Sequence, residues 1–331
     1  MLRRLVTFFY PSERIVAVAT LVATAFYFYF SISGRDPIEL YAHRVSTGLG
    51  WYVFGLLVCF FLLRLRAIHE GRRSGLLVSR LETLRKFKML YANKDRVVHD
   101  LRLFHALSAM FVVFINLKHL LPFLTVTLYD QALVEQERWF FGGVLFSERL
   151  WQLLGFGAAE FLSAMYEYWY TYVAALILLM VFQRNASLAN KFSTAFCLMW
   201  FLGLLLVVVY PTWGPCFYVP EVFEALPKTY MTELQHKLWM NKLHLDKNPM
   251  SEKAVFMISG LPSLHFAATI LGSLFLSKVS KFLSVLSWVF CFLTFLSTIY
   301  FGWHYLMDDV ASVALVLLIW WVVMNKKNVF D

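Results

Sequence analysis

Long apolar runs recur along the 331-residue chain and are separated by polar segments. A helix needs about 20 consecutive apolar residues to cross the hydrocarbon core of a bilayer, where its backbone hydrogen bonds are satisfied internally. We therefore predict an all-α polytopic membrane protein. The runs predict about eight transmembrane helices, at approximately 14–33, 47–64, 102–123, 163–182, 192–210, 255–277, 282–301 and 305–325.

The polar segments divide the chain into two parts. Residues 1–100 are expected to form two N-terminal transmembrane helices and a basic cytoplasmic loop, and residues 101–331 a six-helix membrane core with extracytoplasmic loops at 125–162 and 211–254. Within the first of these loops, residues 131–162 mix aromatic and charged side chains. This mixture favours a segment that lies at the membrane interface over one that crosses it.

Composition supports a membrane protein, because 60% of the residues are hydrophobic and only 15% are charged. A formal net charge of +9 is also found in proteins that bind nucleic acid. However, the Lys and Arg residues lie between the apolar runs, where they set the topology. No nucleic-acid partner is expected.

The distribution of positive charge predicts the orientation. Residues 64–102 hold eleven Lys and Arg against four Asp and Glu, and so belong in the cytoplasm by the positive-inside rule. Alternation then places both termini in the cytoplasm. We expect an integral protein of a plasma (inner) membrane or a Golgi-type membrane. The segment 64–102 is also a candidate binding surface for anionic lipid headgroups.

Candidate chemistry lies at the predicted extracytoplasmic or luminal ends of the late helices. His265 stands near the start of one apolar run, and His304 and Asp308 stand between the last two. A spacing of four residues puts His304 and Asp308 on one face of a helix, where the carboxylate can fix the tautomer of the imidazole. One histidine can then attack phosphorus while the other protonates the leaving oxygen.

Simpler readings of these residues stay open, because a histidine or an aspartate at a helix end is often only a solvated polar group. Two histidines and one carboxylate on separate helices have no specific metal-ligand spacing. We expect neither a metal nor another cofactor.

Two motifs give a resemblance to a known family. The sequence Pro262-Ser263-Leu264-His265, followed by Ser297-Thr298 and by His304 to Asp308, resembles the second and third signature motifs of the type 2 phosphatidic acid phosphatase superfamily. Those motifs read Pro-Ser-Gly-His, and Ser-Arg, five residues, His, three residues, Asp. The resemblance covers roughly residues 190–325. It implies the helical core of that family for the last six helices, with His304 as nucleophile, Asp308 as its orienting partner and His265 as general acid.

Departures from the motifs point to one branch of the superfamily. Thr298 stands where the phosphatases have Arg, and the first motif, Lys, six residues, Arg-Pro, is absent, since aligning Gly214-Pro215 on Arg-Pro puts Val207 on the Lys. Leu264, Thr298 and the phrase from Tyr210 to Pro215 instead resemble the inositol phosphorylceramide synthase-like branch. Members of that branch move a phospho-headgroup between lipid and alcohol acceptors.

Phosphate still requires positive partners, because charge on its oxygens must be stabilised during transfer. The candidates are Lys118 at the end of the third run and Lys237 in the outer loop. The complete set of predicted substrate contacts is Ser263, Tyr210, Gly214, Thr298, Lys237 and Lys118.

The sequence thus predicts a membrane lipid phosphotransferase that works through a phosphohistidine. Its partners are a membrane lipid phosphate donor and a hydroxyl acceptor. With water as the acceptor, the same site is a lipid phosphate or pyrophosphate phosphatase. A non-catalytic lipid-binding or transport protein on the same fold is a further alternative.

Overall fold

The computed structural model describes residues 9–30, 37–74, 79–124, 127–248, 258 and 260–325, and in these ranges every regular element is a helix. The elements are α2 (Pro11–Phe30), α3 (Pro37–Ser74), α4 (Arg80–Tyr91), α5 (Lys94–His119), α6 (Leu121–Leu124), α7 (Asp130–Phe140), α8 (Phe146–Leu154), η1 (Phe156–Ala158), α9 (Ala159–Glu167), α10 (Trp169–Val181), α11 (Ala186–Val209), α12 (Pro215–Tyr218), α13 (Pro220–Phe223), α14 (Tyr230–Lys247), α15 (Leu264–Leu276), α16 (Lys281–Tyr300) and α17 (Leu306–Asn325).

The predicted all-α membrane class is confirmed. Six described segments are long and apolar enough to cross a membrane: Tyr52–Glu70, Lys94–His119, Phe156–Val181, Ala186–Val209, Lys281–Tyr300 and Leu306–Asn325. The runs predicted at 14–33 and 255–277 overlap α2 and α15, which are not among these six. The count of eight therefore stays a prediction.

The run predicted at 255–277 does not form one helix over its described part. Residues 260–263 are not helical, and α15 begins at Leu264 and has only 13 residues. Ser263 ends the irregular segment as the N-cap, since its hydroxyl accepts a hydrogen bond from the backbone N–H of Phe266 at 3.4 Å. Hydropathy alone misses this boundary, because Leu261 and Pro262 continue the apolar run.

The predicted loops are largely helical. In the basic segment 64–102, α3 continues to Ser74, α4 follows, and α5 begins at Lys94. Arg, Lys, Leu and Glu favour helices, and the side chain of Asn93 caps α5 by accepting from the N–H of Arg96 at 2.9 Å. The outer segment 125–162 likewise contains α7, α8, η1 and the start of α9, and the outer segment 211–254 contains α12 to α14.

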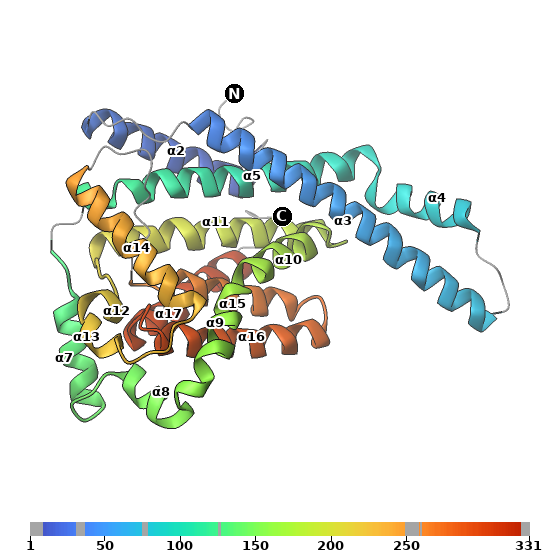
Figure 1. The fold of residues 1–331 in the computed structure, drawn as a ribbon. Coiled ribbons are helices and arrows are strands. Elements are labelled where there is room, and N and C mark those ends of the chain that lie inside the picture. The colour runs from blue at the N-terminus through green and yellow to red at the C-terminus, as the bar shows by residue number, and fades with distance from the viewer. Residues whose placement is uncertain are drawn as a thin grey trace.

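Two hydrophobic cores organise the molecule. The larger lies between α2, α5, α10, α11, α15 and α17, which run along one another as a bundle in Figure 1. The smaller joins α7, α8, α9 and the α12–α14 segment to residues 299–305, between α16 and α17. This second core covers the end of the bundle at which α15 and α17 begin, and it therefore surrounds the histidine motifs.

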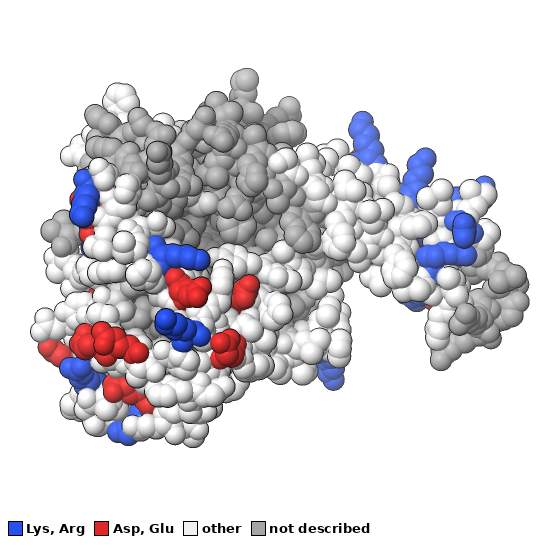
Figure 2. Space-filling view, in the orientation of Figure 1, with Lys and Arg blue, Asp and Glu red and all other residues white. Residues whose placement is uncertain are grey.

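Charge separates along the molecule. α3 and α4 extend together beyond the bundle, and this projecting end carries mainly Lys and Arg (Figures 1 and 2). Asp and Glu gather at the opposite end, over the short outer helices, where some basic side chains accompany them (Figure 2). The orientation of the molecule in a membrane stays a prediction.

Candidate active site

His304 and Asp308 form the predicted pair, in a different local structure from the one expected. His304 precedes α17, so the two residues do not share a helix. Their side chains still meet, with 3.2 Å between Nδ1 of His304 and Oδ2 of Asp308. The same oxygen accepts the backbone N–H of Tyr305 at 3.0 Å. Since this oxygen is an acceptor, Nδ1 carries the ring hydrogen and Nε2 presents its lone pair.

The turn that holds His304 is built by the end of α16. Gly302 has a φ of 65°, the left-handed conformation that glycine adopts readily after a helix. Its N–H bonds to the carbonyl of Ile299 at 2.9 Å, and the N–H of Trp303 bonds to the carbonyl of Thr298 at 2.9 Å. A side chain at position 302 would collide with the ring of Phe223. The backbone before His304 is therefore closely constrained.

Hydrogen bonds join the two histidine motifs directly. The N–H of Ser263 donates to the carbonyl of Asp308 at 3.3 Å. The hydroxyl of Ser312 contacts two carbonyl oxygens, of Ser263 at 2.9 Å and of Asp308 at 2.8 Å. The start of α15 is thereby fixed to the first turn of α17, which places His265 and His304 at one end of the bundle.

Two buried carboxylates from α7, which sequence reasoning missed, hold the surrounding loops. Asp130 accepts the N–H groups of Trp213 and Gly214 and the hydroxyl of Tyr305, each at 3.0 Å. Glu137 accepts the N–H of Leu306 at 2.7 Å, which satisfies a free donor at the start of α17. The sequence feature that could have indicated them is their spacing of seven residues, because on a helix this spacing puts both side chains on one face.

Burial changes the acidity of both carboxyl groups. It raises the pKa of Asp130 to about 6 and that of Glu137 to about 7, while their hydrogen bonds from the backbone oppose the shift. Both residues thus take up protons more readily in the folded protein than in the unfolded chain. Folding stability falls as pH rises through the interval between the unfolded and folded pKa values.

For Glu137, this interval runs from 4.5 to about 7. The wild-type protein is expected to lose on the order of 3 kcal/mol of stability from this group across it. Glu137→Gln, which does not titrate, should reduce the fall in melting temperature between pH 5 and pH 8, measured by differential scanning fluorimetry in one detergent. Equal slopes for the two proteins would contradict the assignment.

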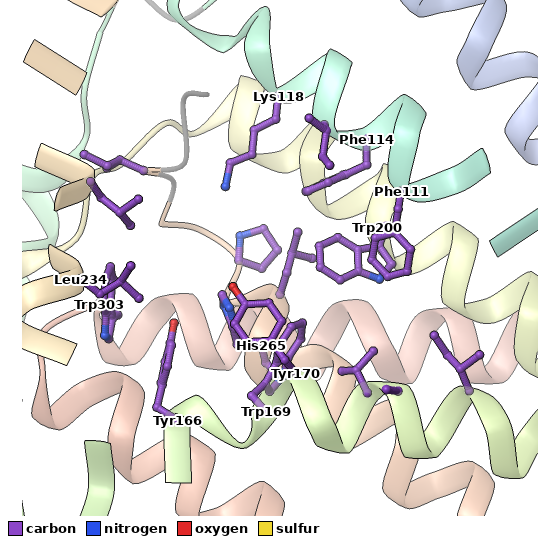
Figure 3. Close-up of a pocket in the computed structure, with 18 of the residues that line it drawn as sticks. Phe111, Phe114, Lys118, Tyr166, Trp169, Tyr170, Trp200, Leu234, His265 and Trp303 are labelled. Carbon is purple, nitrogen blue, oxygen red and sulfur yellow. The ribbon is translucent and has the colours of Figure 1, made fainter. Parts of the chain in front are cut away.

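A cavity of about 470 Å³ opens beside the pair and is lined by both His265 and His304. The ring of His265 lies 4.4 Å from that of Trp169 and 5.0 Å from that of Tyr166, centroid to centroid. Lys118 extends into the cavity from α5, on the side opposite Tyr166 and Trp169, as Figure 3 shows. Lys118 is the one Lys or Arg among the described residues that line this cavity. A phosphate beside the histidines would therefore meet a positive charge.

The other predicted substrate contacts lie outside the cavity wall. Ser263 and Thr298 are buried behind it, where the hydroxyl of Thr298 donates to Oδ2 of Asp309 at 3.3 Å. Tyr210 stacks on Tyr129 at 4.1 Å. Lys237 is exposed on α14 and does not line the cavity. Of the two chosen lysines, only Lys118 is brought together with the histidines.

Gly214, another predicted contact, supports the histidine turn from outside the cavity. Its φ of 95° requires a conformation that other residues rarely adopt, and a side chain there would collide with the carbonyl of Trp303. Two residues further along the chain, Cys216 in α12 donates its N–H to the carbonyl of Gly302 at 2.9 Å. Gly214 thus allows the loop after α11 to pack directly on the backbone that precedes His304.

In the described part of the chain, no group of three or more His, Cys, Asp or Glu side chains is placed to hold a metal ion. A family model described as the PAP2 superfamily matches residues 131–322. The match takes in α7 from its second residue, α8 to α16 and most of α17, and so includes both histidines, Asp308 and Glu137, whereas Asp130 directly precedes it. No curated protein and no solved structure matches the chain.

Proposed function

Because the chain belongs to the PAP2 superfamily, we propose that it is a membrane lipid phosphotransferase that moves a phosphate or phospho-headgroup from a lipid-linked donor to a hydroxyl acceptor. The observation that carries the proposal is the hydrogen-bonded pair of His304 and Asp308 beside a cavity that His265 also lines. Membership of the superfamily supports chemistry of the lipid phosphatase or phosphotransferase type.

The first step uses His304 as nucleophile. Its Nε2 attacks phosphorus, the bond from phosphorus to the leaving oxygen breaks, and a phosphohistidine forms. His265 in its protonated form gives its proton to the leaving oxygen. Asp308 holds Nδ1 and stabilises the positive charge that develops on the His304 ring.

The second step reverses the roles. Neutral His265 takes the proton of the acceptor hydroxyl, whose oxygen attacks phosphorus while the nitrogen–phosphorus bond breaks. His304 is released unchanged, and His265 is protonated again for the next cycle. Lys118 stabilises negative charge on the phosphate oxygens in both steps and supplies part of the charge that the absent family cations would provide.

We propose further that the site faces the extracytoplasmic or luminal side. Basic residues stand at the opposite ends of the helices that carry it: Lys278 follows α15, and α16 begins at Lys281. By the positive-inside rule, these ends are cytoplasmic. Within the superfamily, Leu264, Thr298 and the phrase from Tyr210 to Pro215 favour the inositol phosphorylceramide synthase-like branch.

An acceptor-dependence assay tests the proposal. The purified protein is incubated with lipid phosphates, lipid pyrophosphates and phosphoinositides, with and without polyol, sugar or lipid acceptors, and products are identified by mass spectrometry. We expect a phosphorylated acceptor that forms only when the acceptor is present. Release of free phosphate at the same rate without any acceptor would replace the transferase with a phosphatase. Turnover of no donor would favour a non-catalytic lipid-binding or transport protein.

A further inference from the structure

The cavity beside the histidines continues away from them as an apolar groove between α5 and α10. On α5, the wall is formed by Phe104, Leu107, Phe111 and Phe114, which lead up to Lys118 at the histidine end. These residues recur three or four positions apart and so occupy one face of the helix. The single charged member, Lys118, therefore stands at one end of a continuous apolar strip.

α10 forms the facing wall and runs in the opposite direction. Trp169 lies at the histidine end, and Ala174 and Leu178 follow along the groove. The antiparallel arrangement is fixed at the far end, where the Arg96 side chain of α5 donates to the carbonyl of Val181 at 2.7 Å. Aromatic rings from both walls and from α11 meet near the histidine end, with 4.6 Å between the centroids of Phe114 and Trp200 (Figure 3).

The groove is long enough to hold a hydrocarbon chain that spans one leaflet of a membrane. Fourteen positions separate Phe104 from Lys118, which corresponds to about 21 Å at roughly 1.5 Å per residue. One leaflet provides about half of the ~30 Å hydrocarbon core. The far end is limited by an aromatic cluster, in which Phe104 packs edge-on against Tyr52 at 5.6 Å and Phe182 at 6.4 Å.

We propose that this groove binds one hydrocarbon chain of the lipid whose phosphate lies between Lys118 and the two histidines. Identifying the ligand as a phosphate-bearing lipid rests on the proposed function. A single cavity contains both the polar end and the apolar walls, so one amphiphile fills both. Ala174 lies five residues beyond Trp169, or about 7 to 8 Å along α10, and its small side chain leaves the middle of the groove open.

Chain-length dependence of binding tests the groove without requiring turnover. Butyl-, octyl- and hexadecylphosphonate, which carry no cleavable phosphate ester, are titrated into the full-length protein in nanodiscs by calorimetry. Ala174→Trp should block the groove. Ala175→Trp is the matched control, because Ala175 is the next residue of the same helix, is exposed and does not line the cavity.

Ala174→Trp is expected to bind hexadecylphosphonate at least about tenfold more weakly than the control, because two or more methylenes lose their burial. Butylphosphonate should bind to both equally. The wild-type protein should bind each phosphonate with the same affinity as Ala175→Trp. Ser108 also lines the groove, on α5. If Ala174→Trp does not fold, Ser108→Phe should likewise weaken the binding of hexadecylphosphonate without weakening that of butylphosphonate.

The groove and the proposed reaction fail in distinguishable ways. Equal chain-length dependence in Ala174→Trp or Ser108→Phe and in Ala175→Trp would overturn the groove, whatever the turnover of the wild-type protein. If the blocked variants bind long phosphonates more weakly than Ala175→Trp does, but the wild-type protein turns over no donor, the groove is retained and the proposed reaction is excluded.

Discussion

His304→Ala is expected to abolish turnover of the donor lipid, with a loss in kcat of at least about 10³-fold. The substitution removes the nitrogen that would form the bond to phosphorus, and His265, the other histidine of the cavity, is left with its proposed role of general acid. His304 is 5% exposed and its Nδ1 contacts only the Asp308 oxygen in the described hydrogen bonds, so its loss leaves few partners unsatisfied. Initial rates with the preferred donor check the loss.

Two further variants separate chemistry from folding. His236→Ala removes an exposed histidine from α14 and should leave the rate unchanged. Asp308→Asn keeps an oxygen for the N–H of Tyr305 but weakens control of the imidazole, and should lower kcat by about 10²-fold or more. Undiminished turnover in a well-folded His304→Ala protein would exclude the proposed nucleophile.

Asp130→Ala is expected to cause the largest loss of stability, on the order of 3 kcal/mol or more. The substitution leaves three buried donors without their acceptor: the N–H groups of Trp213 and Gly214 and the hydroxyl of Tyr305. The loop after α11 and the start of α17 would both lose their shared support. Denaturation followed by circular dichroism measures the effect.

A matched variant on the same helix controls for the loss of a carboxylate as such. Glu135 is exposed and accepts only from the side chain of Gln131 among the described contacts, so Glu135→Ala should cost little. Asp130→Asn retains one acceptor oxygen and should recover part of the stability and of the turnover. Equal stability of Asp130→Ala and Glu135→Ala would show that the three hydrogen bonds do not support the site.

The helical membrane class follows from the sequence because hydropathy acts locally. A run of apolar residues is costly in water and must satisfy its backbone internally in lipid, so its position alone predicts a helix. The ends of helices depend on single residues, and one boundary was wrong for that reason. Ser263 is the N-cap of α15, and the residues directly before it, 260–262, are not helical although Leu261 and Pro262 are apolar.

The basic segment between the early runs illustrates a second limit. Its charges predict an orientation, because the positive-inside rule counts residues and ignores their conformation. Charge does not distinguish an exposed helix from an irregular loop. α4 and the extended end of α3 therefore required coordinates to be recognised.

The residues of the histidine pair could be chosen from sequence spacing, although the reason for their contact differs from the expected one. A common helix face predicted that His304 and Asp308 would meet. They meet instead because the turn after α16 folds back over the first turn of α17. The three positions between His304 and Asp308 allow either geometry, and the hydrogen bonds of Gly302 and Trp303 to the end of α16 select between them.

What the sequence by itself determined is the class of protein, the approximate positions of its helices and the identity of His265, His304 and Asp308 as candidates. The tertiary structure decided which other groups join them. Asp130 and Tyr305 are 175 residues apart, and no local pattern encodes their contact. Lys118 and Lys237 had equal standing as charges in the sequence, but only the packing of α5 against α10 brings Lys118 into the cavity. Hydropathy and helical spacing act between near neighbours, whereas a site depends on which helix faces meet.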